Sequence, residues 1–507
     1  MKKRFTQVLN RILTFIENAG NKLPHPATIF LIFALSVPLF SWLAHLLEWN
    51  TIHPATGEIV RPVNLLSVKG LHLMLTEMIT NFTGFAPLGV VMVAMLGIGI
   101  AEESGLISAL VRLMVLSAPR RILTFMIVFT GILTNVASDV GYVLLIPLAG
   151  MIFIAFRRHP IVGMTAAFAG VSGGFSANLM LGTIDPLLAG LSQEAAQILD
   201  PAYTVNPTAN YYFMVVSTFF IAATGTFITE KITEPRYAKK KVSIQSGSIE
   251  KLKPNERKGL RVAGITMLIC LVLLLIGMIP AQGILRGEDG SLLASPVIKG
   301  IVALIFLLGA ISGMAFGFAS GKFKNDHDVI KGMEVSMTHL AGYLVLVFFA
   351  AQFVAYFKWS NLGIIFAIKG ASFLSNLNLG LPVLLILFII LSGIINLFIG
   401  SASAKWALLA PVFIPMFMLM GYSPELSQVV YRIGDSVTNI ISPMMSFFVL
   451  IIAFFQRYDK NAGMGTIISL MLPYTVGFFI VWTILLILWI KLGIPLGPGV
   501  SLFYPAG

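Results

Sequence analysis

Charged residues are scarce in this sequence. Of its 507 residues only 11% are Asp, Glu, Lys or Arg, whereas 57% are hydrophobic and the mean hydropathy is +0.90. A soluble globular protein carries about 25% charged residues, so the composition excludes that class. The single cysteine, Cys270, excludes an internal disulfide and any cysteine-ligated metal. The net charge of +12 comes from basic residues in short loops between apolar runs, a pattern typical of membrane topology and not of nucleic-acid binding.

Long apolar runs make up most of the chain. The run ATIFLIFALSVPLFSWLAHLL, which begins at Ala27, is one of several that reach the roughly 20 residues a helix needs to cross a bilayer. These runs are too long for barrel strands, and backbone groups in lipid must be bonded internally, so a multi-span helical bundle is expected. The N-terminal MKKRFTQVLNRILTF is basic and amphipathic and lacks the features of a cleaved signal peptide.

Basic residues set the expected topology. Lys and Arg cluster at the N-terminus, in the linker between the two halves and in several loops, all of which are expected to be cytoplasmic. Threading the apolar runs between these anchors gives nine crossings and leaves the C-terminus outside. The crossings are expected at about residues 27–47, 85–103, 161–190, 210–230, 261–281, 297–318, 338–357, 428–455 and 470–491.

Two further segments have to enter the membrane and return on the same side. Residues 122–155 begin and end beside cytoplasmic arginines and carry the polar stretch TNVASDVG at their middle. Residues 382–419 do the same from the outside, with GSASAKW at their tip. Polar irregular backbone at membrane depth must be buried in protein or water, so both segments are predicted to be re-entrant hairpins.

The expected fold is therefore an all-α integral membrane protein with about nine transmembrane helices and two re-entrant hairpins. The linker is too polar to form a packed core. The predicted order is an amphipathic cytoplasmic N-terminus (1–26), a first membrane half (27–230, with hairpin 122–155 and broken helix 161–190), a basic cytoplasmic linker (231–260), a second membrane half (261–491, with hairpin 382–419 and broken helix 428–455) and a short external C-terminus (492–507).

The two halves are related by an inverted repeat. A shift of 264 positions places Tyr142 on Trp406 and Gly170 on Gly434, and the two copies enter the membrane from opposite sides. Each hairpin is followed by a span that glycine and proline interrupt. The freed carbonyls and half-helix ends of such spans can bind ions and substrate. This pattern is typical of a secondary transporter.

Ionisable side chains inside spans are costly to bury, so each is a candidate functional group. They gather at the breaks related by the repeat: Asp139, Asp185, Lys405, Arg432 and Asp435. Their oxygen-bearing neighbours are Ser138, Asn178, Ser401, Ser403, Thr438 and Asn439. Such oxygens suit sodium, whereas a buried carboxylate can instead bind a proton, and the sequence leaves both open. Trp406 offers an aromatic face for a flat ring, or packs against its own hairpin.

The charged candidates also have purely structural explanations. Arg432 and Asp435 lie three positions apart on one helix and could neutralise each other. Lys405 could extend from the hairpin tip to the outer surface. Asp139 could cap a half-helix, and Asp185 could belong to a proline turn.

An intramembrane enzyme is the alternative from a different class. GVSG at 170–173 matches the G-x-S-G of a rhomboid-type serine protease, but the later histidines, His327 and His339, lie in or beside a charged loop. IGD at 433–435 lacks the first glycine of an aspartyl protease's G-x-G-D, because Arg432 stands there. A passive channel for small anions is the other alternative, although broken helices around a charged centre suit alternating access.

Specific motifs from the first span to the C-terminus carry a resemblance to a known family. They are NKLPHPATIF, NFTGFAPLG, SGGFSANLMLGTIDPLLAG, AQFVAYFKWSN, SASAKWALLAPVFIPMFMLMGY, YRIGDSVTNIISPMMSFF and GIPLGPG. In these motifs the chain resembles the AbgT family, the p-aminobenzoyl-glutamate transporters. It is especially similar to the branch described as exporting sulfonamide antimetabolites.

The resemblance implies ion-coupled transport of folate-pathway aromatics such as p-aminobenzoyl-glutamate or p-aminobenzoate, or export of sulfonamide drugs. It also implies a homodimer in a bacterial inner membrane. The coupling ion would be sodium or a proton, and no cofactor or enzymatic activity is expected. The residues that the family uses along its substrate path fall here on Asp185, Ser403, Trp406, Arg432, Asp435 and Pro443. Lys405 lies at a position that the family is not expected to fix, and the direction of transport does not follow from the sequence.

These inferences combine into one expected mechanism. A cation binds near Asp435, Asn439 and the second hairpin tip, with a symmetric candidate site at the first tip, and orders the hairpins. The substrate sits between the tips, with its ring near Trp406 and its carboxylate near Arg432 or a half-helix N-terminus. The hairpin unit then moves against the remaining spans.

Overall fold

A computed structural model of the chain describes residues 24–52, 57–136, 140–237, 252–288, 290–292, 295–377, 379–445 and 447–504. This part of the chain is almost entirely helical, and β1 (Thr51–Ile52) and β2 (Ile59–Val60) form a small antiparallel ribbon. The predicted all-α membrane class is confirmed. The candidates Ser138 and Asp139, the first 23 residues and residues 238–251 of the basic linker lie outside the described residues.

The first half of the chain contains both long apolar helices and short irregular segments. Its α-helices are α2 (Pro26–Leu46), α3 (Val68–Thr76), α4 (Met78–Thr83), α5 (Ala86–Glu103), α6 (Leu106–Leu116), α7 (Leu123–Leu133), α8 (Ile146–Ala155), α9 (Pro160–Phe168), α10 (Ile184–Ala196), α11 (Tyr211–Ile228) and α12 (Glu234–Tyr237). Its 3₁₀ and π segments are η1 (Arg120–Ile122), η2 (Thr134–Val136), η3 (Gly141–Leu145), η4 (Ala169–Gly173) and η5 (Thr229–Thr233).

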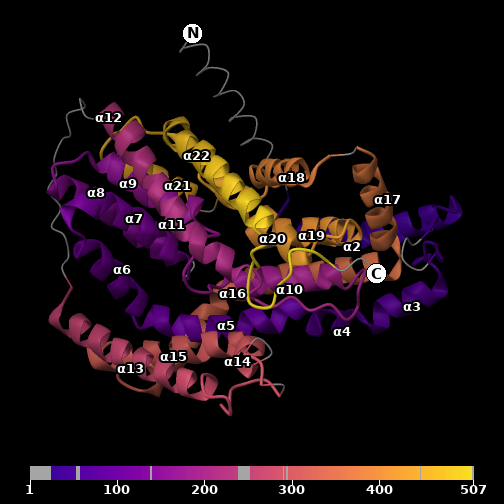
Figure 1. The fold of residues 1–507 in the computed structure, drawn as a ribbon, viewed down its shortest axis with the longest axis horizontal. Coiled ribbons are helices and arrows are strands. Elements are labelled where there is room, and N and C mark those ends of the chain that lie inside the picture. The colour runs from indigo at the N-terminus through magenta and orange to yellow at the C-terminus, as the bar shows by residue number, and fades with distance from the viewer. Residues whose placement is uncertain are drawn as a thin grey trace, which may run out of the picture.

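The second half contains the longest helices. They are α13 (Pro254–Met278), α14 (Pro296–Lys299), α15 (Ile301–Ser320), α16 (Asp326–Trp359), α17 (Leu362–Asn376), α18 (Leu381–Asn396), α19 (Ala402–Leu419), α20 (Pro424–Asn439), α21 (Phe448–Gln456) and α22 (Met464–Lys491). In Figure 1, α5, α15 and α13 run side by side along one edge, while α10, α19 and α20 gather nearer the centre.

Within the described residues, eight continuous helices are long and apolar enough to cross a membrane: α2, α5, α11 with its extension to Tyr237, α13, α15, α16, α19 and α22. All of them except α19 lie at predicted crossings. The predicted crossings 161–190 and 428–455 are absent from this set because each is broken. The first is interrupted between Gly173 and Ile184, and the second between Asn439 and Phe448.

At the two segments predicted to be hairpins, the chain forms helix pairs. The first pair is α7 followed by η3 and α8, and the second is α18 followed by α19, with residues 397–401 as the connection. One glycine of the broken helix in each half allows the first arm to pack closely against it. A Cβ at Gly170 would lie 2.3 Å from the Val128 carbonyl oxygen, and one at Gly434 would lie 2.4 Å from that of Ile389. The repeat seen in the sequence therefore corresponds to the same packing in both halves.

The two broken helices meet near the middle of the molecule. The hydroxyl of Ser436 on α20 accepts a hydrogen bond from the backbone N–H of Ser176, just after η4, at 3.0 Å. A Cβ at Gly173 would contact Ile440 and Phe478, so this glycine permits close approach of α20 and α22. The interruptions of the two halves are thereby brought together.

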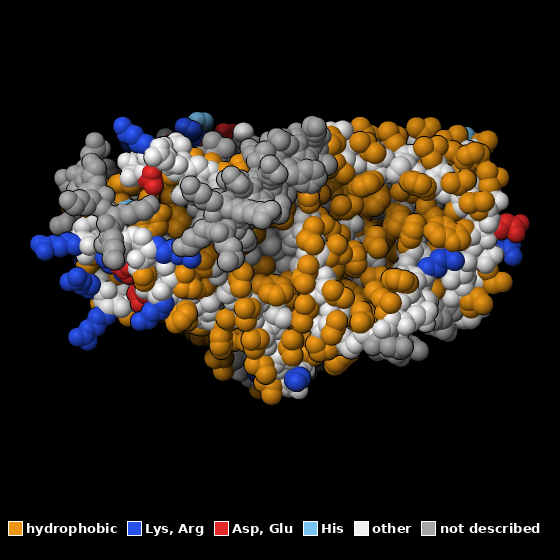
Figure 2. Space-filling view, turned by 90° about the horizontal axis from the view of Figure 1, so that it is seen from above, with side chains coloured by type: hydrophobic (Ala, Val, Ile, Leu, Met, Phe, Trp, Pro, Cys, Tyr) orange, Lys and Arg blue, Asp and Glu red, His pale blue; other side chains and the backbone are white. Residues whose placement is uncertain are grey.

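Segments that the charge bias assigns to the same side of the membrane also contact one another. Arg158 pairs with Glu234 at 2.7 Å and Arg112 pairs with Glu256 at 2.6 Å, all in segments expected to be cytoplasmic. Figure 2 shows many of the Lys and Arg side chains gathered at one end, with a broad hydrophobic surface over the rest. On the opposite side, the C-terminal segment lies against the connection between α19 and α20, where Ser423 donates its backbone N–H to Leu502.

Candidate functional site

Asp185 and Arg432 form a buried ion pair between the two broken helices. Asp185 is in the first turn of α10, and one oxygen, Oδ2, accepts a hydrogen bond from the backbone N–H of Gly182 at 2.7 Å. Its other oxygen lies 2.7 Å from Nη1 of Arg432 on α20, and the two side chains are 1% and 3% exposed. Arg432 therefore does not neutralise Asp435, its neighbour three positions along the same helix, because its guanidinium group reaches across to α10.

The guanidinium group of Arg432 is incompletely satisfied. Its Nε and Nη2 atoms have no hydrogen-bond partner among the described residues, although both are buried. A guanidinium group carries five N–H donors in a fixed fork, and leaving buried donors unpaired is costly. This arrangement favours an acceptor that comes from outside the protein chain.

Lys405 lies at the centre of a second buried cluster. Its ammonium group donates to the carboxylate of Asp435 and to the side-chain oxygen of Asn396, and its side chain is fully buried. The possibility that Lys405 extends to the outer surface is therefore wrong for this structure. Because Asn396 ends α18, Lys405 is on α19 and Asp435 is on α20, the cluster ties both arms of the second hairpin to the broken helix.

The side-chain amide of Asn396 extends this cluster along α20. Its nitrogen, which carries two N–H donors, lies within hydrogen-bond distance of three acceptors: the Asp435 carbonyl at 2.7 Å, the Thr438 hydroxyl at 2.8 Å and the Asn439 side-chain oxygen at 2.7 Å. Thr438 and Asn439, which the sequence nominates as ion ligands, thus lie beside Asp435. The Lys405 ammonium provides a positive charge between the Asp435 carboxylate and the Asn396 amide oxygen, while the Thr438 and Asn439 oxygens face the Asn396 amide nitrogen.

The first half carries no such charge at the matching positions. The shift of 264 places Lys405 on Gly141 and Asp435 on Val171. A Cβ at Gly141 would lie 2.2 Å from the Thr134 hydroxyl oxygen and 2.8 Å from a methyl group of Val171, so uncharged groups fill the position that the ion pair has in the second half. Asn178 accepts bonds from the backbone N–H groups of Leu179 and Met180, which stabilise its own turn.

Trp406 is enclosed by its neighbours. Its ring stacks on Tyr431 with centroids 4.4 Å apart, its indole N–H donates to the Ser192 hydroxyl at 2.9 Å, and its side chain has no exposed surface. The packing explanation therefore describes this conformation, and the packing includes contacts with α20 and α10.

The remaining candidates lie at the hairpin tip and the adjacent break. Ser401 caps α19 by accepting the backbone N–H of Ala404, and its hydroxyl lies 3.1 Å from that of Ser403. Pro443 is in the break between α20 and α21, which packs against the tip. A Cβ at Gly400 would lie 2.2 Å from the carbonyl oxygen of Met444.

A chain of buried polar side chains, which the sequence analysis does not nominate, continues from Trp406. The Ser192 hydroxyl donates to Gln428 at 2.6 Å, and the Gln428 amide donates to Asn210 at 2.8 Å. Asn210 donates to the Glu425 backbone carbonyl at 3.0 Å. Tyr203 donates its hydroxyl to the Glu425 carboxylate at 2.9 Å. We call these six residues, from Trp406 to Tyr203, the polar chain.

Tyr203 remains a hydrogen-bond donor over the physiological pH range. It lies in the loop between α10 and α11, where burial raises the pKa of its hydroxyl above the ordinary value. The neighbouring Glu425 carboxylate raises this pKa further, because it disfavours a second negative charge.

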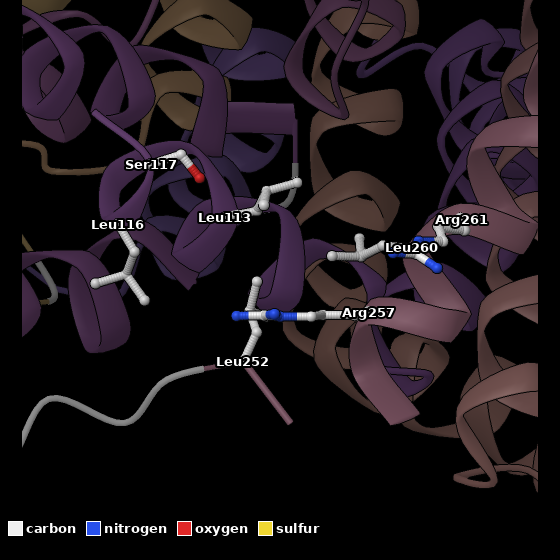
Figure 3. Close-up of a pocket in the computed structure, with 7 residues that line it drawn as sticks. All are labelled: Leu113, Leu116, Ser117, Leu252, Arg257, Leu260 and Arg261. Carbon is white, nitrogen blue, oxygen red and sulfur yellow. The ribbon is translucent and has the colours of Figure 1, made fainter. Parts of the chain in front are cut away.

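A separate groove lies at the surface, and none of the residues of the central site lines it. It has a volume of about 680 Å³ and lies between the end of α6 and the start of α13 (Figure 3). Its lining residues are Leu113, Leu116, Ser117, Leu252, Arg257, Leu260 and Arg261. None of the candidate substrate or ion residues lines this groove, so it is distinct from the site between the broken helices.

The two central ion pairs and the paired broken helices can be compared with known proteins. The model of the AbgT family of transporters matches residues 11–504. This chain belongs to the AbgT family. Over 495 residues it is 39% identical to the p-aminobenzoyl-glutamate transport protein of Escherichia coli K12, an alignment that covers 97% of this chain and 96% of that protein.

Two solved structures are similar to this AbgT-family protein over nearly its whole length. The YdaH transporter of Alcanivorax borkumensis is 48% identical, with a TM-score of 0.91 over 94% of this chain and 100% of the other. MtrF of Neisseria gonorrhoeae, described among antimetabolite efflux pumps, is 49% identical, with a TM-score of 0.89 over 97% and 100%. The family and these relatives are transporters and not enzymes, which confirms the predicted class.

Sequence reasoning missed Asn396 and most of the polar chain. Asn396 is an isolated amide in the apolar run LSGIINLFIG, and such a residue in a membrane helix is itself a signal of an interhelical hydrogen bond. Glu425 and Gln428 lie in PELSQ, at the edge of the predicted crossing, where polar residues are usually taken as loop.

Proposed function

We propose that this AbgT-family protein is an ion-coupled secondary transporter of folate-pathway aromatics, an exporter of sulfonamide antimetabolite drugs, or both. The proposed substrates are p-aminobenzoyl-glutamate, p-aminobenzoate and sulfonamide antimetabolites. The name of the Escherichia coli relative supports the first, and the description of MtrF supports an efflux role for the last.

The observation that carries the proposal is the state of Arg432. Its charge is balanced by Asp185, yet two of its buried nitrogen atoms have no partner among the described residues. A substrate carboxylate would accept both N–H groups in a bidentate pair, the strongest hydrogen-bonded arrangement that a guanidinium group makes. Both p-aminobenzoate and p-aminobenzoyl-glutamate carry a carboxylate, so the substrate class matches the donor group.

Ion coupling is proposed to act on the cluster of Asn396, Lys405 and Asp435. The Asp435 carboxylate and the Asn396 amide oxygen have the chemistry of a sodium site, but both accept hydrogen bonds from the Lys405 ammonium in this conformation. A sodium ion would have to displace that ammonium, whereas a proton would act by neutralising the carboxylate. Either event would loosen the contact between the second hairpin and α20.

We further propose a homodimer in a bacterial inner membrane, with the N-terminus cytoplasmic and the C-terminus periplasmic. The loop charges favour this orientation. The outer surface of α13 is apolar, with Ile265, Leu268 and Leu273 each more than half exposed, as suits a helix that faces lipid or a second subunit.

The test is transport in liposomes containing the purified protein. Uptake of p-aminobenzoyl-glutamate and of a labelled sulfonamide would be measured under imposed sodium or proton gradients. Arg432→Lys keeps the charge but removes the bidentate fork, so we expect about a tenfold or greater loss of transport of the carboxylate substrate, on the order of 1.4 kcal/mol or more. Arg457→Lys, at an exposed arginine, is the matched control.

Each outcome bears on the proposal. Gradient-dependent flux in the wild type that Arg432→Lys lowers and Arg457→Lys preserves would support it. Flux that ignores both gradients would indicate a channel. No flux of either compound from a folded protein would overturn the substrate assignment.

A further inference from the structure

The buried charges of the described residues do not balance. Five charged side chains are buried there: Asp185, Lys405, Glu425, Arg432 and Asp435. Asp185 is paired with Arg432, and Asp435 is paired with Lys405. Glu425 remains, and it forms no ion pair with a basic side chain of the described part of the chain.

Glu425 is the second residue of α20 and is 4% exposed. Its carboxylate accepts the neutral hydroxyl of Tyr203, and its backbone carbonyl accepts the amide of Asn210. An ionised carboxylate that is buried with only neutral donors has a large solvation cost, which proton binding removes. The Glu425 site is therefore suited to hold a proton, whereas the two central carboxylates are suited to remain charged.

Glu425 contacts Tyr203, which lies in a loop that also contains exposed residues. The ring of Tyr203 contacts that of Tyr504, with centroids 5.8 Å apart, and the Tyr504 hydroxyl donates to Asp200 at 3.1 Å. Asp200 is followed by the exposed residues 201 and 202. Among the described residues, Tyr203 is the titratable group that contacts the Glu425 carboxylate, and Tyr504 and Asp200 lie behind Tyr203. The carboxylate also accepts hydrogen bonds from the Ser423 hydroxyl and from its own backbone N–H, which are neutral donors.

On its other side Glu425 is linked to the moving parts of the proposed transporter. The polar chain runs from its backbone through Asn210, Gln428 and Ser192 to Trp406 on the second hairpin. Side-chain amides do not relay protons readily, so this connection transmits position and not the proton itself. A change at the start of α20 would reach the hairpin through it.

We propose that Glu425 is a proton-binding site of this transporter, loaded from the side on which the second hairpin opens and separate from the central ion pairs. A proton from water adds to the carboxylate and yields the neutral acid, with no other bond made or broken. The role of this proton in coupling rests on the proposed function, whereas the proton site itself does not.

The first experiment measures the proton without transport. Infrared difference spectra of the purified protein in liposomes would be recorded between about pH 5 and pH 9, where a carboxyl perturbed by burial titrates. We expect a carboxylic acid band that disappears in Glu425→Gln, which keeps the size and the acceptor for Tyr203. The band should persist in Glu194→Gln, a matched control at another partly buried glutamate, whose carboxylate accepts the backbone N–H of Ala86.

A titrating band that survives in Glu425→Gln, or that disappears in Glu194→Gln, would overturn the proposal, as would the absence of such a band in the wild type.

The second experiment compares substrate exchange at equal pH with uptake driven by a proton gradient. We expect Glu425→Gln to retain substrate exchange at equal pH. Its uptake driven by a proton gradient should be at least tenfold lower than that of the wild type. Failure of exchange in the wild type would count against the proposed function alone, because the infrared result does not depend on substrate.

Discussion

At the residue scale, the central site is a set of charges held in cross-helix pairs. Spacing along one helix suggests that Arg432 and Asp435 pair with each other, but each finds its partner on another element. A buried charge that loses its partner is strongly destabilising, whereas replacement of both partners by apolar groups is often neutral. Because of this asymmetry, comparing a single variant with a double variant separates the effect of an ion pair on stability from its effect on transport.

The Lys405 and Asp435 pair allows a direct stability test. Lys405→Met leaves the Asp435 carboxylate buried and unpaired, so we expect a loss of roughly 3–5 kcal/mol in the free energy of unfolding. The double variant Lys405→Met, Asp435→Leu should recover most of that loss but should not transport. Thermal unfolding in detergent and flux in liposomes would check the two expectations, and a double variant no more stable than the single one would contradict the first.

The sequence identifies most of the candidate residues but not how they pair. Ionisable residues inside apolar runs are visible directly, and Asp185 and Lys405 lie in the first turns of α10 and α19, as the sequence predicts. Arg432 and Asp435 instead lie within α20, ahead of the break that follows Asn439. Their partners depend on the tertiary contact of α10, α19 and α20, which no local spacing contains. The same limit explains why the sequence allows the Lys405 side chain to extend to the outer surface, whereas in the structure it is buried.

At the element scale, the hairpins depend on glycines that let helices approach closely. Gly170 and Gly434 occupy equivalent positions in the two halves, and each faces a backbone carbonyl of the preceding first arm. Such small-residue contacts are the usual means by which membrane helices pack. The lengths of α2, α13, α15 and α22 follow from apolar composition alone, whereas the broken helices follow from glycine and proline.

Gly434→Ala tests this packing. The added Cβ would lie 2.4 Å from the Ile389 carbonyl oxygen, which is backbone and cannot rotate away, so α18 must shift. We expect a loss of about 1–3 kcal/mol, the usual cost of overpacking, and a lower unfolding temperature in detergent. Gly342→Ala on α16 is the control, because its Cβ would meet no atom within 4 Å and Ala favours a helix. Equal stability of the two variants would rule out the close contact.

At the scale of the whole molecule, segments expected on one side of the membrane contact one another. The C-terminal segment, the connection from α19 to α20 and the start of α11 meet on one face, where Tyr212 also donates its backbone N–H to Leu496. Loop charge alone predicts this grouping, because it depends on the number of crossings and not on side-chain detail. The orientation of that face is the part which remains a prediction.

Labelling of single cysteines in intact cells tests the orientation. With Cys270→Ser as the background, Ile284→Cys and Leu492→Cys replace side chains that are 90% and 71% exposed and that are expected outside. We expect a membrane-impermeant maleimide to label both in intact cells and to label Lys322→Cys only after permeabilisation. The opposite pattern would invert the topology.

The inverted repeat joins two hairpins of similar shape but different chemistry. The second is held to its broken helix by Lys405 and Asp435, whereas the matching place in the first holds Gly141 against Val171. Separating a buried ion pair requires water or a replacement ion to enter, while separating an apolar contact does not. If the second hairpin acts as a gate, it opens only when a counter-ion is supplied for the separated charges, so its opening is linked to the entry of that ion.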